Sequence, residues 1–93
     1  MRSIRRTEAF KRDLKRESTG EYRIVLKEEF LKIVEALASD IPLPAQRYDH
    51  ALIGNRAGYR ECHIRPDLLL LYRKPDESTL ELIRLGSHSE ILD

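Results

Sequence analysis

The stretch that decides the fold is ECHIRPDLLLLYR, residues 61–73. Its four consecutive leucines run into Tyr72, and such an unbroken apolar run is typical of a strand that is buried on both faces. Directly before the leucines stand His63, Arg65 and Asp67, at the mouth of the most apolar run of the chain. We expect a central strand whose packed side chains hold these polar groups near a fixed geometry.

Strand and turn patterns surround this run, and Gly54 and Gly58 punctuate the segment before it. The elements that this half of the chain predicts are, in order, a short strand at residues 51–53, a strand at residues 59–64, a turn at residues 65–67, the central strand at residues 68–73, a hairpin loop at residues 75–78 and a last strand at residues 79–85. Together they predict an antiparallel meander.

The first half of the chain is helical in pattern. Residues 3–7 predict a short strand, and Thr7 is a suitable N-cap for a helix that ends near Gly20, on which Phe10 and Leu14 recur four residues apart. A second helix is predicted by apolar residues with a 3.6-residue period, namely Leu26, Phe30, Ile33, Val34 and Leu37. The prolines at positions 42 and 44 forbid its continuation.

The expected fold class is therefore α+β: an N-terminal strand, two helices, then the antiparallel meander, with the helices packed on one face of the sheet. Too little chain is left to cover the other face of the sheet. We expect polar residues near the strand ends to line a shallow cleft on that open side.

Length, composition and charge limit the class of protein that this fold can form. A chain of 93 residues fits one domain, residues 1–93, and its 41% of hydrophobic residues permits a folded core. The formal net charge is only +1, yet residues 1–19 hold seven arginine or lysine residues against three acidic ones, which suits either phosphates or a solvated helix face. Cys62 is the only cysteine, which excludes an internal disulfide and fits a reducing cytoplasm. The longest apolar run is far shorter than a membrane span, so we expect a soluble protein.

Ionisable side chains gather at the ends of the predicted strands: His50, His63, Asp67, Arg84 and His88. Antiparallel pairing brings strand ends together although the sequence separates them. Such a set suits the cutting of RNA without a metal ion, which needs a base for the 2′-hydroxyl proton, an acid for the leaving 5′-oxygen and a cation for the phosphorane. Histidine in general serves both proton roles near neutral pH.

Each of these residues also has a structural interpretation. His63 would pair with Asp67 to tie the turn, an interpretation that the residues alone slightly favour. His50 and His88 would be exposed loop histidines, and Arg84 would be half of an ion pair. Histidines and an aspartate are also zinc ligands, but neither HExxH nor C-x-x-C spacing occurs, so no metal is expected. Spacing alone leaves the question of an enzyme open.

A longer pattern is more specific. The run PLPAQRYDHALIGNRAGYRECHIRPDLLLLYR at residues 42–73, followed by IRLGSHSEIL at residues 83–92, resembles the YafQ branch of the RelE/ParE toxin superfamily, whose members carry a pattern close to PLP…DH-L-G…GYRE-HI-PDWLL-Y…R-G-H. The order of elements before residue 42 agrees with it. The resemblance implies a RelE/ParE-like fold and a toxin of a type II toxin-antitoxin system, a ribosome-dependent mRNA endoribonuclease that inhibits translation.

Carried over residue by residue, the resemblance implies a catalytic site made of His50, His63, Asp67, Arg84 and His88. His88 is expected to be the general acid and Asp67 or His50 the base, although the two roles are exchangeable. His63 is expected to orient or contact the phosphate, and Arg84 to be the cation on the scissile phosphate.

Two positions depart from the family pattern. Leu68 stands where the family often has Trp, and Ile91 with Leu92 replaces a terminal aromatic residue. Because a base stacked on an aromatic ring gains about 1 to 3 kcal/mol, the loss of a ring is expected to weaken or retune codon choice without abolishing cleavage.

The resemblance also implies partners. They are the ribosome, mRNA and a cognate antitoxin of the ribbon-helix-helix DNA-binding type, with no cofactor and no membrane. Since the overall charge is mild, binding is expected to rest on a local basic patch: Lys11, Arg12, Lys15, Arg16, Arg56, Arg60 and Arg65. Two other functions remain as alternatives, a ParE-like toxin that acts on gyrase without nuclease chemistry and a catalytically silent binding module on the same scaffold. The polar set at the strand ends favours the nuclease.

Overall fold

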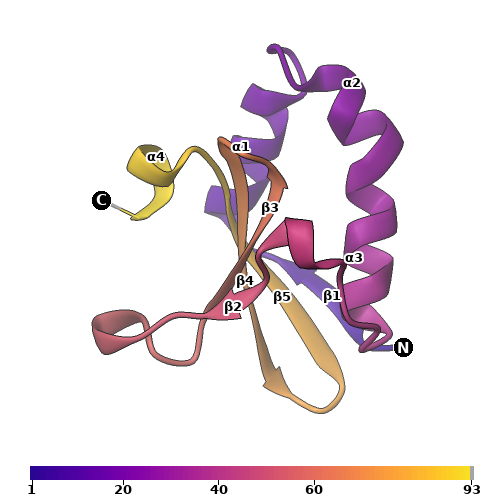
Figure 1. Ribbon diagram of the computed structural model, residues 1–93, viewed down its shortest axis with the longest axis vertical. Helices are drawn as coiled ribbons and strands as arrows, with labels where there is room; N and C mark the ends of the chain where they lie inside the picture. The colour runs from indigo at the N-terminus through magenta and orange to yellow at the C-terminus, as the bar shows by residue number, and fades with distance from the viewer. Residues whose placement is uncertain (93) are drawn as a thin grey trace.

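The computed structural model describes residues 1–92, and its centre is a five-stranded sheet in the order β1-β5-β4-β3-β2 (Figure 1). The strands are β1 (Ser3–Arg6), β2 (His50–Ala51), β3 (Arg60–Arg65), β4 (Leu68–Asp76) and β5 (Thr79–Gly86). Strands β2 to β5 form the predicted antiparallel meander with β4 at the centre of the sheet. β1 pairs with β5 in parallel and forms one edge.

Both predicted helices are confirmed, and they cover one face of the sheet (Figure 1). The first is α1 (Glu8–Glu17), whose N-cap Thr7 accepts a hydrogen bond from the Phe10 backbone N–H at 3.0 Å. The second is a continuous run of α2 (Arg23–Val25), the π-helical turn η1 (Leu26–Phe30) and α3 (Leu31–Ala38). It ends before the two prolines, which cannot continue a helix.

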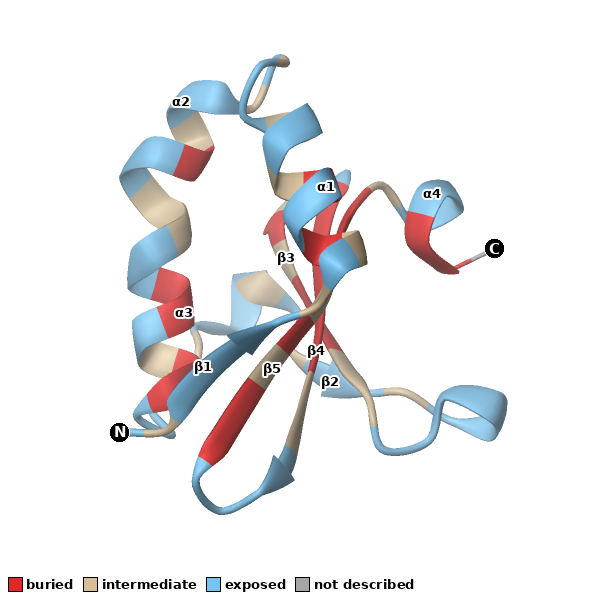
Figure 2. Ribbon diagram, turned by 180° about the vertical axis from the view of Figure 1, so that it is seen from behind, coloured by how far each residue is buried: buried red, intermediate tan, exposed pale blue. Residues whose placement is uncertain are grey.

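β4 is buried on both faces, as its leucines predict (Figure 2). Leu68, Leu70 and Tyr72 pack toward the helices in the main core, and each is at most 1% exposed. Leu69 and Leu71 point to the opposite side and belong to a second, smaller cluster. The strand is therefore fixed by packing from two directions.

The second face of the sheet carries a third helix, which the sequence analysis did not predict. A short helix, α4 (His88–Leu92), follows β5 and lies on the face away from α1 to α3 (Figures 1 and 2). Its Ile91 and Leu92 are buried against Leu69 and Leu71. Two apolar side chains on that face of β4 need a cover, and the last residues of the chain supply it. The open side of the sheet is consequently narrower than predicted.

Two boundaries also differ from the prediction. β2 lies one residue earlier than residues 51–53, because His50 and Ala51 pair with β3. The hairpin loop predicted at residues 75–78 is only a two-residue turn, since β4 continues to Asp76. Pro75, which has no N–H to donate, is accommodated because the pairing of β4 with β5 is irregular between Arg73 and Asp76.

Asp13 joins α1 to β5 and is only 2% exposed. Its carboxylate accepts hydrogen bonds from Arg84 Nε at 2.6 Å, from the Leu85 backbone N–H at 3.0 Å and from Arg16 at 3.0 Å. Burial alone raises the pKa of Asp13, but these hydrogen bonds and the two positive charges outweigh it and hold the pKa below its ordinary value of 3.8. The carboxylate therefore stays ionised and fixes Arg84 against the helix.

We expect Leu70→Ala to lower the free energy of unfolding by about 2 to 5 kcal/mol, because Leu70 is fully buried and its truncation leaves a cavity. Urea denaturation followed by circular dichroism measures this loss. Leu31→Ala is the matched control, since Leu31 is 61% exposed on α3 and its truncation should change stability by less than about 0.5 kcal/mol. An unchanged urea midpoint for Leu70→Ala would contradict the burial.

A second prediction concerns acid. Because the pKa of Asp13 is lower in the folded than in the unfolded protein, its ionisation stabilises the fold fully above 3.8 and loses this effect as the pH falls through the folded-state pKa. Asp13→Asn should therefore be less stable than the parent near neutral pH, and the difference should shrink as the pH falls below 3.8. Urea titrations at several pH values measure it; a difference that stays constant with pH would rule out this role.

Candidate active site

Strand pairing aligns one row of residues across the face of the sheet that lies away from α1 to α3. His50 on β2 stands opposite Glu61 on β3, Glu61 opposite Leu71 on β4, and Leu71 opposite Arg84 on β5. Neighbouring strands are about 4.8 Å apart, so the backbones of His50 and Arg84 are separated by roughly 14 Å. The register thus places the backbones of His50 and Arg84 in one row, although the Arg84 side chain turns to Asp13 on α1.

A second row lies nearer the end of the sheet. His63 stands opposite Leu69, and Leu69 opposite Gly86, two residues before His88. His63 follows Glu61 by two positions on β3 and therefore shares its face, about 7 Å along the strand. The C-terminal end of β3, the start of β4 and the C-terminal end of β5 all lie at this same end of the sheet. Asp67 and His88 lie there too.

His50 is not the free loop histidine of the structural interpretation. Its Nδ1 donates a hydrogen bond to the Tyr48 carbonyl oxygen at 2.6 Å, since a carbonyl oxygen only accepts. Its Nε2 lies 3.0 Å from Oε1 of Glu61. Both ring nitrogens of His50 are therefore engaged, and the ring is fixed toward β3.

Glu61 is a residue of this site that the prediction missed. It is only 6% exposed, and its second carboxylate oxygen is buried without a hydrogen-bond partner in residues 1–92. A buried carboxylate oxygen without a hydrogen-bond partner costs free energy, so its presence in a fold needs an explanation such as a functional role. The signal was present in the sequence, because Glu61 and His63 are two positions apart on one strand and so must face the same side.

Asp49, the residue before His50, anchors this part of the chain from the other side. The Tyr72 hydroxyl donates a hydrogen bond to Asp49, and Arg60 lies 3.4 Å from the same carboxylate oxygen. Burial, followed by the hydrogen bond to Asp49, raises the pKa of Tyr72, so the hydroxyl keeps the proton that it donates. Asp49 is thus held on the helix side while His50 faces the open side.

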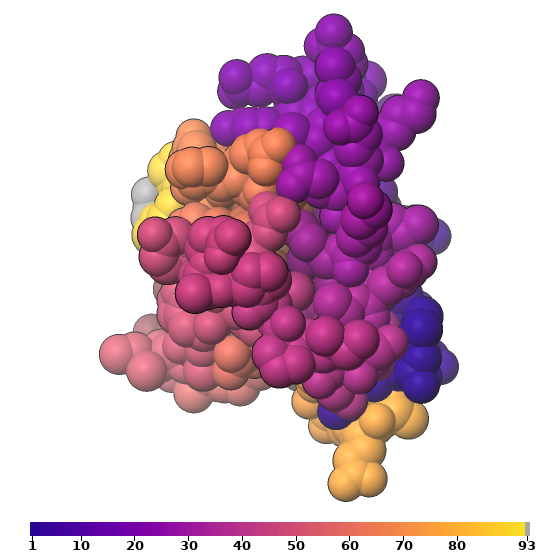
Figure 3. All heavy atoms as spheres, turned by 45° about the vertical axis from the view of Figure 1, so that its right-hand side comes forward, coloured from indigo at the N-terminus to yellow at the C-terminus, as the bar shows by residue number. Residues whose placement is uncertain are grey.

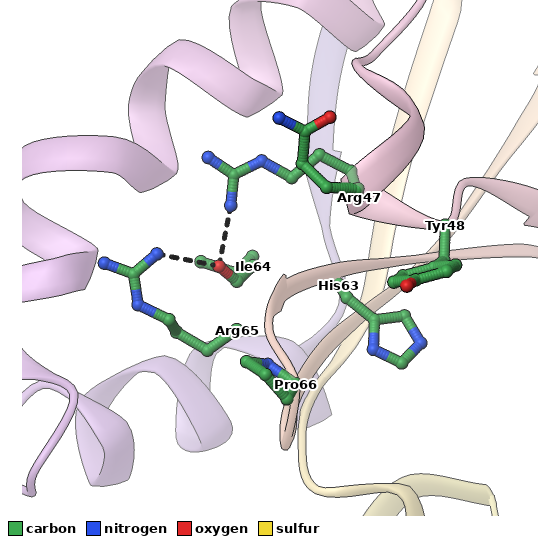
Figure 4. A pocket seen from close by; sticks show the side chains of 7 residues that line it. Arg47, Tyr48, His63, Ile64, Arg65 and Pro66 are labelled. Carbon is green, nitrogen blue, oxygen red and sulfur yellow. Dashed lines mark hydrogen bonds between the residues drawn. The ribbon is translucent and has the colours of Figure 1, made fainter.

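His63 lies beside an open pocket of about 510 Å³ (Figure 4). Its ring meets the ring of Tyr48 edge to face, with 5.5 Å between the centroids. No hydrogen bond joins His63 to Asp67 within the described chain, so the predicted structural pairing of these two residues is absent from this geometry. The other side chains that line the pocket are Gln46, Arg47, Ile64, Arg65 and Pro66.

Asp67 and His88 are exposed. Neither side chain forms a hydrogen bond or ion pair with another described residue, so both are free to meet a ligand. Within residues 1–92, no three His, Cys, Asp or Glu side chains are grouped closely enough to hold a metal ion. No helix of this part of the chain is long and apolar enough to cross a membrane.

Arg84 takes part in the ion pair that the structural interpretation predicts. Its guanidinium binds Asp13 through two nitrogens, at 2.6 and 3.2 Å. The side chain is nevertheless 32% exposed, so part of its charge faces solvent. The hydrogen bond to Asp13 raises the pKa of Arg84 and keeps the guanidinium charged. The buried carboxylate of Asp13 therefore holds the Arg84 guanidinium in a fixed position.

The seven arginines and lysines of the predicted basic patch lie on different elements. Lys11, Arg12, Lys15 and Arg16 are exposed along α1. Arg60 and Arg65, in contrast, point to the helix side of the sheet, where they pair with Asp49 and Glu29 at 3.4 and 2.5 Å. Arg56 donates a hydrogen bond to the carbonyl oxygen of Leu92. The arginines of the second half of the chain are therefore engaged in internal contacts. On α1, Arg12 and Lys15 are exposed without an internal partner among residues 1–92, and Lys11 is exposed at 3.3 Å from Glu8.

Known proteins share both this sequence and this fold. A family model described as the bacterial toxin of type II toxin-antitoxin system, YafQ, matches residues 2–93. A Haemophilus influenzae protein named as a YafQ toxin is 33% identical over 84 residues, which cover 87% of this chain and 82% of the relative. The mRNA interferase toxin YafQ of Escherichia coli K12 is 41% identical over 51 residues, which cover 55% of this chain and 54% of that protein.

The structural likeness extends over the whole chain. The crystal structure of the DinJ-YafQ complex from Escherichia coli contains a chain that matches this one with a TM-score of 0.82 and 29% identity, covering 100% of both chains. The expected RelE/ParE-like fold is confirmed by this match.

Proposed function

The chain belongs to the YafQ family of toxins from bacterial type II toxin-antitoxin systems, and from this premise we propose that it is an endoribonuclease that cuts mRNA on the ribosome and so inhibits translation. The observation that carries the proposal is the strand register, which puts His50, His63 and Arg84 in two neighbouring rows of the sheet and Asp67 and His88 at the strand ends beside them. The mRNA interferase activity of the Escherichia coli relative supports it.

The reaction needs two proton transfers and one bond exchange. The ribose 2′-oxygen bonds to phosphorus as its proton passes to a base, and the bond from phosphorus to the 5′-oxygen breaks as an acid protonates that oxygen. The products are a 2′,3′-cyclic phosphate and a 5′-hydroxyl. Each well-placed acid or base contributes about 10²- to 10⁴-fold.

The geometry favours Asp67 over His50 as the base. Both ring nitrogens of His50 are already engaged, by the Tyr48 carbonyl oxygen and by Glu61, whereas the carboxylate of Asp67 is exposed and unbonded within residues 1–92. His88 is exposed at the start of α4 and suits the acid that protonates the leaving oxygen. His50 and Glu61 together then orient the substrate from the neighbouring row.

Arg84 is the cation that this proposal assigns to the scissile phosphate. Asp13 fixes its guanidinium from behind, so the charge is preorganised and needs no rearrangement when the phosphorane forms. His63 stands one row away on β3, where it can contact a phosphate oxygen. Few groups suffice because the ribosome holds the mRNA in place, and positioning supplies a large part of the barrier reduction.

The partners follow from the family. We propose that residues 1–93 act as one toxin domain in the cytoplasm, that a cognate antitoxin of the ribbon-helix-helix type inhibits it, and that the complex covers the open face of the sheet. The Escherichia coli relative was crystallised as a DinJ-YafQ complex, which supports an antitoxin partner.

We expect His88→Ala to slow cleavage because the general acid is lost. The variant should keep its stability, because the His88 side chain forms no hydrogen bond or ion pair with another residue of 1–92. Primer extension on a translated message with purified ribosomes measures the cuts, and thermal denaturation measures the fold. The rate should fall by about 10²- to 10⁴-fold. Ser89→Ala, at the next exposed position, is the control that should cut normally.

Two results would contradict the proposal. Efficient cutting of naked mRNA without ribosomes would mean that the ribosome does not position the substrate. Growth arrest by the intact protein without any cuts would move the target from mRNA to another one, such as gyrase.

The exposed lysines of α1 give a test of the basic patch. We expect Lys11→Ala with Lys15→Ala to weaken ribosome association and to reduce the slope of log affinity against log salt by about 2, because each lysine that neutralises a phosphate contributes about one to that slope. Sedimentation with ribosomes at several salt concentrations measures it. Lys27→Ala with Lys32→Ala, which removes two exposed lysines from the second helical run, should leave the slope unchanged. An unchanged slope for the α1 pair would exclude α1 from the interface.

A further inference from the structure

Tyr48 is unusual among the aromatic residues of the chain. It is 66% exposed, whereas the other tyrosines and both phenylalanines are buried or half-buried. Its backbone is left-handed, with φ of 50° and ψ of 42°. A bulky side chain rarely adopts this conformation, and such strained positions cluster at functional sites. The exposed ring of Tyr48 on a strained backbone is therefore a candidate contact for a ligand.

The segment that carries Tyr48 is held firmly. The 3₁₀ turn η2 (Ala45–Arg47) precedes it, and the Tyr48 backbone N–H donates to the Ala45 carbonyl oxygen at 3.0 Å. Arg47 donates to the Ile64 carbonyl oxygen at 2.7 Å and to Glu29 at 3.0 Å, which ties the turn to β3 and to the helices. In Figure 3 this segment, in magenta to pink, lies on the surface beside the helices. The ring is exposed, but its support is rigid.

The ring of Tyr48 forms one side of the pocket beside His63 (Figure 4). The pocket volume of about 510 Å³ falls in the usual range for small-molecule sites. The two arginines of the pocket, Arg47 and Arg65, both turn toward the single carboxylate of Glu29, so one net positive charge remains there, on the side of the pocket away from the Tyr48 ring (Figure 4). The side of the pocket that Tyr48 and His63 form is aromatic and suits a flat group that stacks on the Tyr48 ring.

We propose that Tyr48 is the stacking platform for one mRNA base next to the scissile phosphate, an inference that rests on the proposed function. Bases of any kind stack on an aromatic ring, and the gain is large enough to set a preference. The Tyr48 carbonyl oxygen also orients His50, at 2.6 Å from Nδ1, so the same residue links the stacked base to the row of His50. Leu68, fully buried, offers no surface for a base.

Two substitutions separate the ring from the backbone. Tyr48→Phe keeps the ring and removes only the hydroxyl. Tyr48→Asn removes the ring but keeps a residue that tolerates the left-handed backbone, so the carbonyl contact from position 48 to His50 is preserved. Ile24→Asn, at a residue of α2 that is 57% exposed, is the control for introducing asparagine at an exposed apolar position.

The experiment is ribosome-dependent cleavage of a translated message, with the cut ends mapped by sequencing and kcat/KM measured for the preferred codon. We expect Tyr48→Asn to lower kcat/KM by about 5- to 150-fold and to change the base preference at one fixed codon position, with an unchanged melting temperature. Tyr48→Phe and Ile24→Asn should remain within about twofold of the parent and keep its codon preference.

Each other outcome has a distinct meaning. If the parent cuts and Tyr48→Asn cuts at the same codons and rate, the stacking role is overturned while the proposed function stands. If Tyr48→Phe loses as much activity as Tyr48→Asn, the hydroxyl and not the ring is needed, which also overturns it. If the parent makes no ribosome-dependent cuts, the proposed function fails and the inference fails with it.

Discussion

The burial of β4 on both faces is the constraint on which the rest of the structure depends. Leu68 and Leu70 point to one side and Leu69 and Leu71 to the other, so the strand is stable only in the middle of a sheet with apolar cover above and below. The helices provide one cover. α4 provides the other cover, and its first residue, His88, thereby lies at the end of the sheet where β4 begins. The same helix therefore completes the core and positions a residue of the candidate site.

Side chains alternate along a strand, so neighbouring residues of each polar segment face opposite sides of the sheet. One neighbour supports the fold and the other faces the candidate site. Asp49 turns inward to Tyr72 while His50 turns outward to Glu61. On β3, Cys62 is fully buried between the outward residues Glu61 and His63, and burial raises the pKa of its thiol to about 12, so it is an inert core residue. In these two segments, each outward group has an inward neighbour that is packed or hydrogen-bonded. Small sheets can hold a polar surface rigidly in this way without a second domain.

Patterns with a strong period were predictable from the sequence, and contacts between distant segments were not. The helices, the meander and the buried leucines follow from local periodicity, and the family pattern identified the fold. α4 was missed because Ile91 and Leu92 are too few to show a period, and only the apolar side of β4 explains their burial. Glu61 was overlooked because its partner, His50, lies on another strand. The clamp of Asp13 on Arg84 was foreseen only as a generic ion pair, since 71 positions separate its two residues. The catalytic roles themselves remain predictions.

The parallel pairing of β1 with β5 has a consequence for how the protein is made. Ser3 lies opposite Thr79, and Asp13 meets Arg84, so the first segments of the chain find their partners only among the last ones. Translation delivers the amino terminus first, and β1 and α1 must wait unpaired until β5 emerges. A nascent chain from which β5 has not yet emerged therefore lacks Arg84, and its β1 and α1 have no strand to pack against.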